Sequence, residues 1–225
     1  MSPTLWDTLY KLSLLYVRDK GLMTSTTKLA ETTGLSQQTV SRHLIMLERF
    51  GLIERQVTVR GEEIKISEKG LEELRKVYYG LKVVIEGVPK TIIFEGKLFT
   101  GIREAAYYMG LKPYRDQFLR KLGFDPYPGT VNLKLLSASD IRAKKELESY
   151  PGIEIESYRD KNRTYSSAKC FKAKINDEVD GALIMVERTY YDASVLEVIA
   201  PVYLRERLKL KDGSTVRVEV FTGTD

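Results

Sequence analysis

In the second half of the chain, Gly123 to Leu135 reads GFDPYPGTVNLKL. Prolines and glycines in its first part favour a tight turn, and its second part alternates like a strand. Thr130 and Asn132 are two residues apart, so on a strand both side chains project to the same face. A hydroxyl and an amide oxygen placed in this way can share one magnesium ion, which prefers hard oxygen ligands and keeps water or phosphate oxygens as the rest. The pattern predicts a metal site suited to phosphoryl transfer.

Short apolar segments surround this stretch from about residue 89 onward. Many short strands in a small domain are typical of a closed or nearly closed barrel. Helices are expected after Ser137 and at residues 202–208. The expected strands are Thr91–Glu95, Leu98–Ile102, Ala105–Met109, Val131–Leu135, Ile153–Glu156, Cys170–Ile175, Ala182–Glu187, Val195–Ile199 and Val216–Phe221.

Residues 5 to about 80 have apolar side chains at helical spacing instead. The third expected helix has an apolar face, formed by Val40, Leu44 and Leu47, and a separate polar face. In order, we expect helices at 5–17, at 25–33 and after Ser36, strands at 52–59 and 64–66 around the Arg60-Gly61 turn, and a helix from Ser67 toward Tyr79.

Residues 27–44 and the hairpin after them resemble the winged helix-turn-helix family. The resemblance covers about the first 80 residues and implies double-stranded DNA as a partner. A three-helix module for dimerisation or protein contact is the alternative, and the sequence leaves a homodimer open. His43 is interpreted as a partly buried helix residue without a role. The residues implied in DNA contact are Gln37, Gln38 and Ser41 at base edges, Arg42 at bases or phosphate, and Arg60 at the backbone or minor groove.

Local structure changes once along the chain, from helices to short strands. We place the change between Gly80 and Pro89, where a short extended run ends in Gly87-Val88-Pro89. The chain is therefore expected to be an α+β protein of two domains, residues 1–88 and residues 89–225.

The 225 residues include 36 basic and 31 acidic side chains, and the net charge of +5 mildly favours phosphate-bearing partners, either nucleic acid or nucleotide. The single cysteine, Cys170, cannot form an internal disulfide, and the second half has no histidine. Asp7 and Lys11 interrupt the apolar stretch at residues 5–17, so neither a signal peptide nor a membrane span is expected. We expect a cytoplasmic protein.

Residues 123–135 resemble the signature of the archaeal CTP-dependent riboflavin kinases, and other segments match that family in the same order. Upstream, residues 96–106 (GKLFTGIREAA) resemble its glycine-rich nucleotide loop. Downstream, Arg188-Thr189 and residues 196–205 (LEVIAPVYLR) resemble its flavin-binding and second nucleotide-binding segments. The resemblance spans about residues 91–221 and implies a six-stranded barrel whose loops form a cradle.

The same resemblance implies an activity and a set of site residues. The activity is phosphate transfer from CTP to riboflavin, which makes FMN and uses Mg²⁺. Thr130 and Asn132 are implied as magnesium ligands, and Thr189 and Glu197 as flavin-binding residues. The implied nucleotide-binding residues are Gly101, Ile102, Arg103, Glu104, Ala105, Ala106, Val202, Tyr203, Leu204 and Arg205.

Glu197 lies in the apolar run from Leu196 to Ile199, where a carboxylate needs a polar partner such as a ribityl hydroxyl. We hypothesise that Glu197 is a general base that orients or deprotonates the attacking 5′-hydroxyl. The choice of CTP over ATP rests on the family alone.

Two alternatives stay open. Arg103 and Ala105 stand where the family's loop has glycines that let backbone amides approach phosphate. One alternative is therefore a regulator of flavin-related genes whose barrel senses flavin or nucleotide with weak or no catalysis. The other is a kinase whose helical domain only dimerises.

Two further groups of residues have no assigned role. The basic run Arg142-Ala143-Lys144-Lys145 is interpreted as a solvated helix face. Six aromatic residues are candidates for stacking on a flavin ring, although a barrel core or surface explains most of them: Tyr107, Tyr108, Tyr114, Phe118, Tyr190 and Tyr191.

Overall fold

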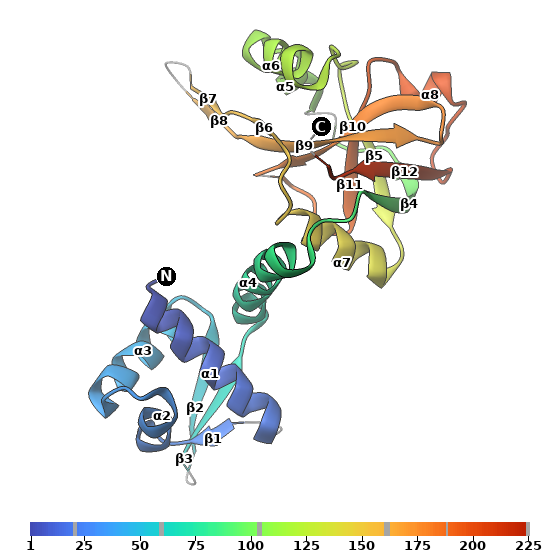
Figure 1. Cartoon of the computed structure of the whole chain (residues 1–225). Coiled ribbons are helices and arrows are strands. Elements are labelled where there is room, and N and C mark those ends of the chain that lie inside the picture. The colour runs from blue at the N-terminus through green and yellow to red at the C-terminus, as the bar shows by residue number, and fades with distance from the viewer. Residues whose placement is uncertain (20–21, 59–60, 103–104, 160–162, 188, 224–225) are drawn as a thin grey trace. The chain divides into compact units, whose positions relative to one another are not determined.

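The computed structural model describes residues 1–19, 22–58, 61–102, 105–159, 163–187 and 189–223. The chain divides into two compact units, Met1–Leu81 and Lys82–Asp225. Figure 1 shows the first unit in blue and teal and the second in green to red. Within the described ranges, no helix is both long and apolar enough to cross a membrane.

The first unit combines helices with a small antiparallel sheet, in which the strand order is β1-β3-β2. Its core consists mainly of leucines, and Leu9, Leu29 and Leu44 have no exposed surface. The expected helices and the expected hairpin are present, and β1 is an additional short strand. The elements are α1 (Pro3–Asp19), β1 (Leu22–Thr24), α2 (Thr26–Thr33), α3 (Gln37–Arg49), β2 (Ile53–Thr58), β3 (Gly61–Ile66) and α4 (Glu68–Glu86).

Serine caps and a glycine set the boundaries of α2 and α3. The Ser25 hydroxyl accepts a hydrogen bond from Lys28 N at 3.3 Å, and the Ser36 hydroxyl accepts one from Thr39 N at 3.2 Å. Gly34 ends α2 with a φ of 72°, a backbone conformation that glycine adopts without strain. These contacts explain why the boundaries of the two helices were readable in the sequence.

Helix α4 continues beyond its expected end near Tyr79. It runs to Glu86 and is followed by Gly87, which has a φ of 79°. The expectation of an extended run from Gly80 is therefore wrong for residues 80–86. A single glycine costs a helix only about 1 kcal/mol, and Val83 beyond it packs against the apolar core of the second unit.

The second unit is built on a closed antiparallel barrel of six strands, so the predicted α+β barrel is confirmed (Figure 1). The strand order is β10-β11-β5-β4-β12-β9, and the ring closes where β9 pairs with β10. Strand β6 (Ile153–Ile155) adds to β9 outside this ring. The barrel strands are β4 (Thr91–Phe99), β5 (Val131–Leu135), β9 (Ala168–Ile175), β10 (Val179–Val186), β11 (Val195–Ile199) and β12 (Thr215–Phe221).

Four helices, α5 to α8, lie between barrel strands in the described part of the second unit. The strand expected at Ala105–Met109 is wrong, because these residues form helix α5, which alanine favours and whose Met109 packs into an apolar cluster. The helix expected after Ser137 is present as α7. The remaining elements are α5 (Ala105–Gly110), α6 (Lys112–Leu122), α7 (Ala138–Leu147), α8 (Leu204–Arg207), β7 (Tyr158–Arg159) and β8 (Thr164–Tyr165).

Both faces of the barrel wall are covered by apolar side chains. Leu133 and Leu196 belong to one buried cluster. Ile199 and Ile184 belong to another, together with side chains of α5 and α6. Because successive strand residues point to opposite faces, Asn132 and Glu197 lie on the same face as this second cluster. The fold thus places two polar side chains on the face that α5 and α6 cover.

Candidate functional site

A cavity of about 560 Å³ lies against this face of the barrel wall. Its lining combines strand residues with Met109 of α5 and with Tyr114 and Phe118 of α6. Pockets for small organic ligands measure about 300–1,000 Å³, so the cavity has room for a ligand of that class.

Four polar side chains meet on one wall of the cavity: Thr130, Asn132, Thr189 and Glu197. Strand pairing sets Asn132 of β5 opposite Glu197 of β11. The Thr130 hydroxyl lies 3.3 Å from Asn132 Oδ1 and 3.4 Å from Glu197 Oε1. The Thr189 hydroxyl donates to Glu197 Oε2 at 3.4 Å. The structure therefore brings together all four residues for which a metal or flavin role was expected.

Burial raises the pKa of the Glu197 carboxyl above its usual range. The hydroxyl of Thr189, the charge of Lys144 and the hydroxyl of Thr130 act in the opposite direction and favour the charged form. A carboxylate with a raised pKa and hydroxyl neighbours is suited to accept a proton from a bound alcohol.

Lys144 of α7 is packed against the strand that carries Glu197. Its ammonium group donates to the Val195 carbonyl at 2.5 Å. Burial lowers the pKa of Lys144, and nearby carboxylates, Glu197 among them, partly offset this effect. Lys144 and Glu197 also line a second cavity of about 450 Å³. The interpretation of residues 142–145 as a solvated helix face is therefore wrong for Lys144.

The loop after β4 reaches the same polar wall. Ile102 N donates to the Tyr191 hydroxyl at 3.0 Å. A Cβ at Gly101 would overlap both the Asn132 amide and that hydroxyl, so any other residue here would have to displace these two side chains.

The rest of the expected nucleotide loop is described in part. Arg103 and Glu104 lie outside the described residues. Ala105 and Ala106 form the first turn of α5, and alanine takes helical backbone without strain. The lack of a glycine at residue 105 therefore imposes no backbone penalty.

The second expected nucleotide segment lies at the start of α8. Val202 and Tyr203 are exposed, whereas the Leu204 side chain is buried in the core, so a ligand can meet only the backbone of Leu204. Arg205 Nη2 donates to the Thr100 hydroxyl at 3.2 Å. This bond joins α8 to Thr100, the residue before the first expected nucleotide segment.

Thr130 and Asn132 fit a magnesium ion. Their oxygens Oγ1 and Oδ1 are 3.3 Å apart, and Asn132 is only 5% exposed. Magnesium usually takes one or two protein oxygens and completes its shell with water and phosphate oxygens. Across the described ranges, no group of three or more His, Cys, Asp or Glu side chains forms a metal cluster. The pair therefore suits an ion shared with a phosphate better than an ion enclosed by protein.

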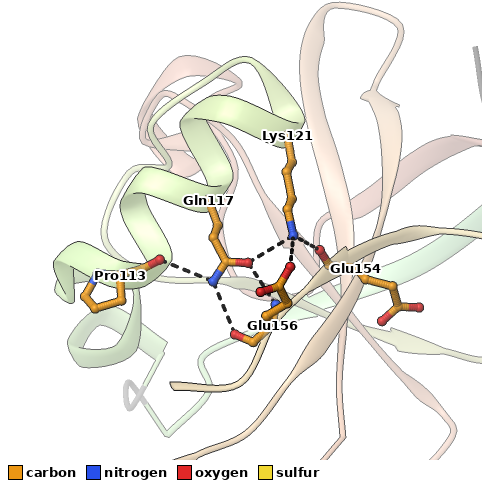
Figure 2. A network of polar contacts seen from close by, with 5 residues as sticks. All are labelled: Pro113, Gln117, Lys121, Glu154 and Glu156. Atoms are coloured by element: carbon orange, nitrogen blue, oxygen red, sulfur yellow. Dashed lines mark hydrogen bonds and ion pairs between the residues drawn. The ribbon is translucent and has the colours of Figure 1, made fainter. Parts of the chain in front are cut away.

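Helix α6, which supplies aromatic side chains to the cavity, is fastened to the segment that contains β6 (Figure 2). Gln117 pairs with the backbone of Glu156 in both directions, with Nε2 donating at 3.2 Å and Oε1 accepting at 2.8 Å. Lys121 Nζ donates to the Glu154 carbonyl at 2.7 Å and to the Glu156 carboxylate at 3.1 Å. These contacts hold the helical wall of the cavity in place.

Sequence reasoning missed part of the cavity lining. Arg163 and Tyr165 line the cavity but belong to no motif. Of the six aromatic candidates, Tyr107 does not line it, and its side chain is 55% exposed. The aromatic candidates that do line the cavity are Tyr108, Tyr114, Phe118, Tyr190 and Tyr191.

Four of the five expected DNA-contacting residues of the first unit lie on α3. Gln38 and Arg42 are exposed and Ser41 is half-buried. The Gln37 side chain donates to two threonine hydroxyls of α2, each at 3.0 Å. Arg60 lies outside the described residues.

Two other groups named in the sequence analysis are buried. His43 is 9% exposed, and its Nδ1 lies 2.8 Å from the Thr8 hydroxyl. Cys170 is fully buried, and burial raises the pKa of its thiol, so the reactive thiolate is disfavoured. Both side chains belong to the apolar interior of their units.

Comparisons with known proteins support one family. A family model named CTP-dep_RFKase, with the description "Domain of unknown function DUF120", matches residues 98–220. A curated relative named riboflavin kinase from Archaeoglobus fulgidus is 42% identical over 96% of this chain and 91% of its own length. The riboflavin kinase of Thermoplasma volcanium is 42% identical over 90% of each chain. That of Methanosarcina mazei is 36% identical over 92% of each chain.

The closed barrel and its polar-walled cavity define a β-barrel protein with room for a small ligand. The chain belongs to the CTP-dependent riboflavin kinase family. The prediction of an enzyme of this family is therefore confirmed.

Replacing Gly101 with alanine is expected to displace the Asn132 amide while the barrel stays folded. Kinase activity should fall about tenfold to a hundredfold, because a misplacement of about 1 Å in a catalytic site can cost that much. The apparent KM for Mg²⁺ should rise in the same assays. Gly110→Ala is the matched control, since nothing lies within 4 Å of its added Cβ. Wild-type activity and Mg²⁺ dependence in Gly101→Ala would contradict the expectation that Asn132 lies at the reacting centre.

Proposed function

We propose that this chain transfers the terminal phosphate of CTP to the 5′-hydroxyl of riboflavin, with FMN and CDP as products. One observation carries the proposal: the half-buried Glu197 carboxylate is held between the hydroxyls of Thr130 and Thr189 on the wall of a cavity of about 560 Å³. The names of the relatives and of the family model supply the flavin and the CTP.

In the proposed reaction, Glu197 orients the 5′-hydroxyl and accepts its proton as the oxygen attacks the terminal phosphorus. The new oxygen–phosphorus bond forms while the bond to the leaving phosphate oxygen breaks, and the negative charge leaves on CDP. Thr189, bonded to the same carboxylate, keeps one of its oxygens in place. Partial burial of the carboxylate strengthens these interactions relative to those of a fully exposed group.

Thr130 and Asn132 are proposed as the protein ligands of Mg²⁺. When bound, magnesium supplies neutralisation of the charge that develops on the transferred phosphate. Gly101 leaves the space that the Asn132 amide occupies. We assign the nucleotide to residues 101–106 and 202–205, and the bond between Arg205 and Thr100, the residue before the first of these segments, supports the assignment.

The decisive experiment is an assay of the full chain with riboflavin, Mg²⁺ and either CTP or ATP, with FMN resolved by chromatography. FMN should form with CTP and be lost in Asn132→Ala, since that variant lacks one of the two expected metal ligands. Flavin binding without FMN formation from either nucleotide would favour the alternative, a regulator whose barrel only senses its ligand.

The raised pKa of Glu197 predicts a pH dependence of the reaction. Only the charged carboxylate accepts a proton, so kcat/KM should fall as the pH decreases through that raised pKa. Glu197→Gln should lower kcat by about a hundredfold to ten-thousandfold, the usual contribution of a general base, and abolish the acidic limb of the profile. A profile from about pH 5 to 9 that is the same in both proteins would eliminate the base role.

A matched pair of variants tests the environment of that carboxylate. Lys144→Met removes a positive charge that favours the charged form of Glu197, so the acidic limb should move to higher pH. Arg142→Met, an exposed change on the same helix, should leave the profile unchanged.

We further propose that residues 1–88 form a winged helix-turn-helix domain that binds double-stranded DNA, and that residues 89–225 form the kinase domain. The exposed side chains of Gln38 and Arg42 on α3 support this assignment, as does the hairpin of β2 and β3. Regulation of flavin-related genes is the corresponding role. A cytoplasmic location and a homodimer stay predictions.

DNA binding is tested with duplexes selected from a random pool by the full chain. Arg42→Ala should weaken binding and reduce the slope of log K against log salt by about one, because one phosphate contact is lost. Arg120→Ala removes an exposed arginine from the barrel unit and should change neither value. If selection enriches no sequence, with or without flavin, the regulatory proposal fails.

A further inference from the structure

The cavity contains a cluster of aromatic and basic side chains apart from its polar wall. The Arg163 guanidinium lies over the rings of Tyr108 and Tyr165, at 5.6 and 5.3 Å from their centroids. Arg163 Nη2 also donates to the Tyr108 hydroxyl at 2.7 Å. The rings of Tyr108 and Tyr165 meet edge to face, with their centroids 6.1 Å apart. All three side chains line the cavity, so the cluster faces the same ligand as Glu197 does.

Charge divides the cavity into two parts. Among the described lining residues, Arg163 is the basic one and Glu197 is the acidic one. Glu197 is bonded to the hydroxyls of Thr130 and Thr189, whereas Arg163 is held by aromatic side chains. A ligand that fills the cavity is therefore expected to present an alcohol to one part and a flat group with hydrogen-bond acceptors to the other.

The wall beside this cluster is apolar and held in place. Met109, Phe118 and Ile184 line the cavity and are almost fully buried. Phe118 belongs to α6, which Gln117 and Lys121 fasten to the β6 segment (Figure 2). A wall whose side chains are already held in place suits a flat ring system, because these side chains lose little conformational freedom when the ring binds.

The ring system of riboflavin has matching chemistry. Its dimethylbenzene end is apolar, and its pyrimidine edge carries two carbonyl oxygens that accept hydrogen bonds. A guanidinium group has five N–H donors in a planar arrangement and also stacks on aromatic faces. The carbonyl edge therefore matches Arg163, and the apolar end matches the wall formed by Met109, Phe118 and Ile184.

We propose that Arg163, positioned by Tyr108 and Tyr165, binds the pyrimidine edge of the flavin ring and determines specificity for that ring. The proposal rests on riboflavin as the substrate and adds a subsite for the ring to the polar wall that holds the ribityl alcohol. Recognition then has two independent parts, one for the ring and one for the chain.

Lumiflavin, which has the isoalloxazine ring but no ribityl chain, separates these two parts. Binding to the full chain is followed by quenching of flavin fluorescence, and riboflavin is titrated in parallel. Arg163→Met should raise the Kd of both ligands about tenfold to a hundredfold, because a hydrogen bond to a charged group is lost. Arg163→Lys keeps the charge without the planar fork and should give an intermediate Kd. Tyr108→Phe keeps the ring but removes the hydroxyl that Arg163 contacts, and a smaller rise is expected.

The matched control is Arg159→Met, an exposed change on β7 at a residue that does not itself line the cavity, and it should leave both Kd values unchanged. Thr189→Ala should weaken riboflavin binding without affecting lumiflavin. Circular dichroism and thermal unfolding establish that each variant is folded.

FMN formation and lumiflavin binding together distinguish an error in the ring subsite from an error in the proposed kinase activity. If wild-type protein makes FMN but lumiflavin does not bind, or binds equally well to Arg163→Met, the ring subsite is wrong and the kinase proposal stands. If wild-type protein neither binds nor phosphorylates riboflavin, both proposals fail.

Discussion

The register of β5 between its two neighbours is the constraint on which the site depends. Asn132 pairs with Phe99 on one side and with Glu197 on the other. Leu133, the next residue, has no exposed surface and lies in the cluster on the opposite face. A slip of one residue would exchange the two faces and bury the amide among apolar side chains. Burial of a leucine contributes about 1.5–3 kcal/mol, so the interactions that stabilise the barrel also determine which side chains face the cavity.

That arrangement places a half-buried carboxylate on the barrel wall. Burial disfavours the charged form of Glu197, while two hydroxyls and the charge of Lys144 favour it. Lys144 is itself packed against the barrel through its bond to Val195. Lys144 and Glu197 do not form a close ion pair with each other. Burial therefore still shifts the pKa of each group toward its neutral form. The carboxylate is thus neither fully neutralised nor fully solvated, which agrees with its proposed role as a general base.

The sequence was most informative where alternating apolar residues lie inside a specific motif. Strands β5 and β11 have the bounds that were expected, Val131–Leu135 and Val195–Ile199, and their pairing explains why Asn132 and Glu197 meet. The run at residues 105–109 is short and apolar, a pattern common to strands and buried helices, and its assignment to a strand was wrong. Tyr108 and Arg163 are 55 residues apart and meet only through the tertiary fold, so neither spacing nor composition indicated their contact.

The side chains of α6 also bond to backbone groups at an edge of the β-sheet. Strand β6 is at the end of its sheet, and such strands present backbone groups that can pair with another chain. Here the Gln117 amide forms hydrogen bonds with the N–H and the carbonyl of Glu156, and Lys121 donates a hydrogen bond to the carbonyl of Glu154 (Figure 2). A side chain thus imitates the next strand of the sheet. The helix that forms a wall of the cavity therefore also covers this sheet edge, and covering an edge strand is one way in which proteins limit pairing between sheets.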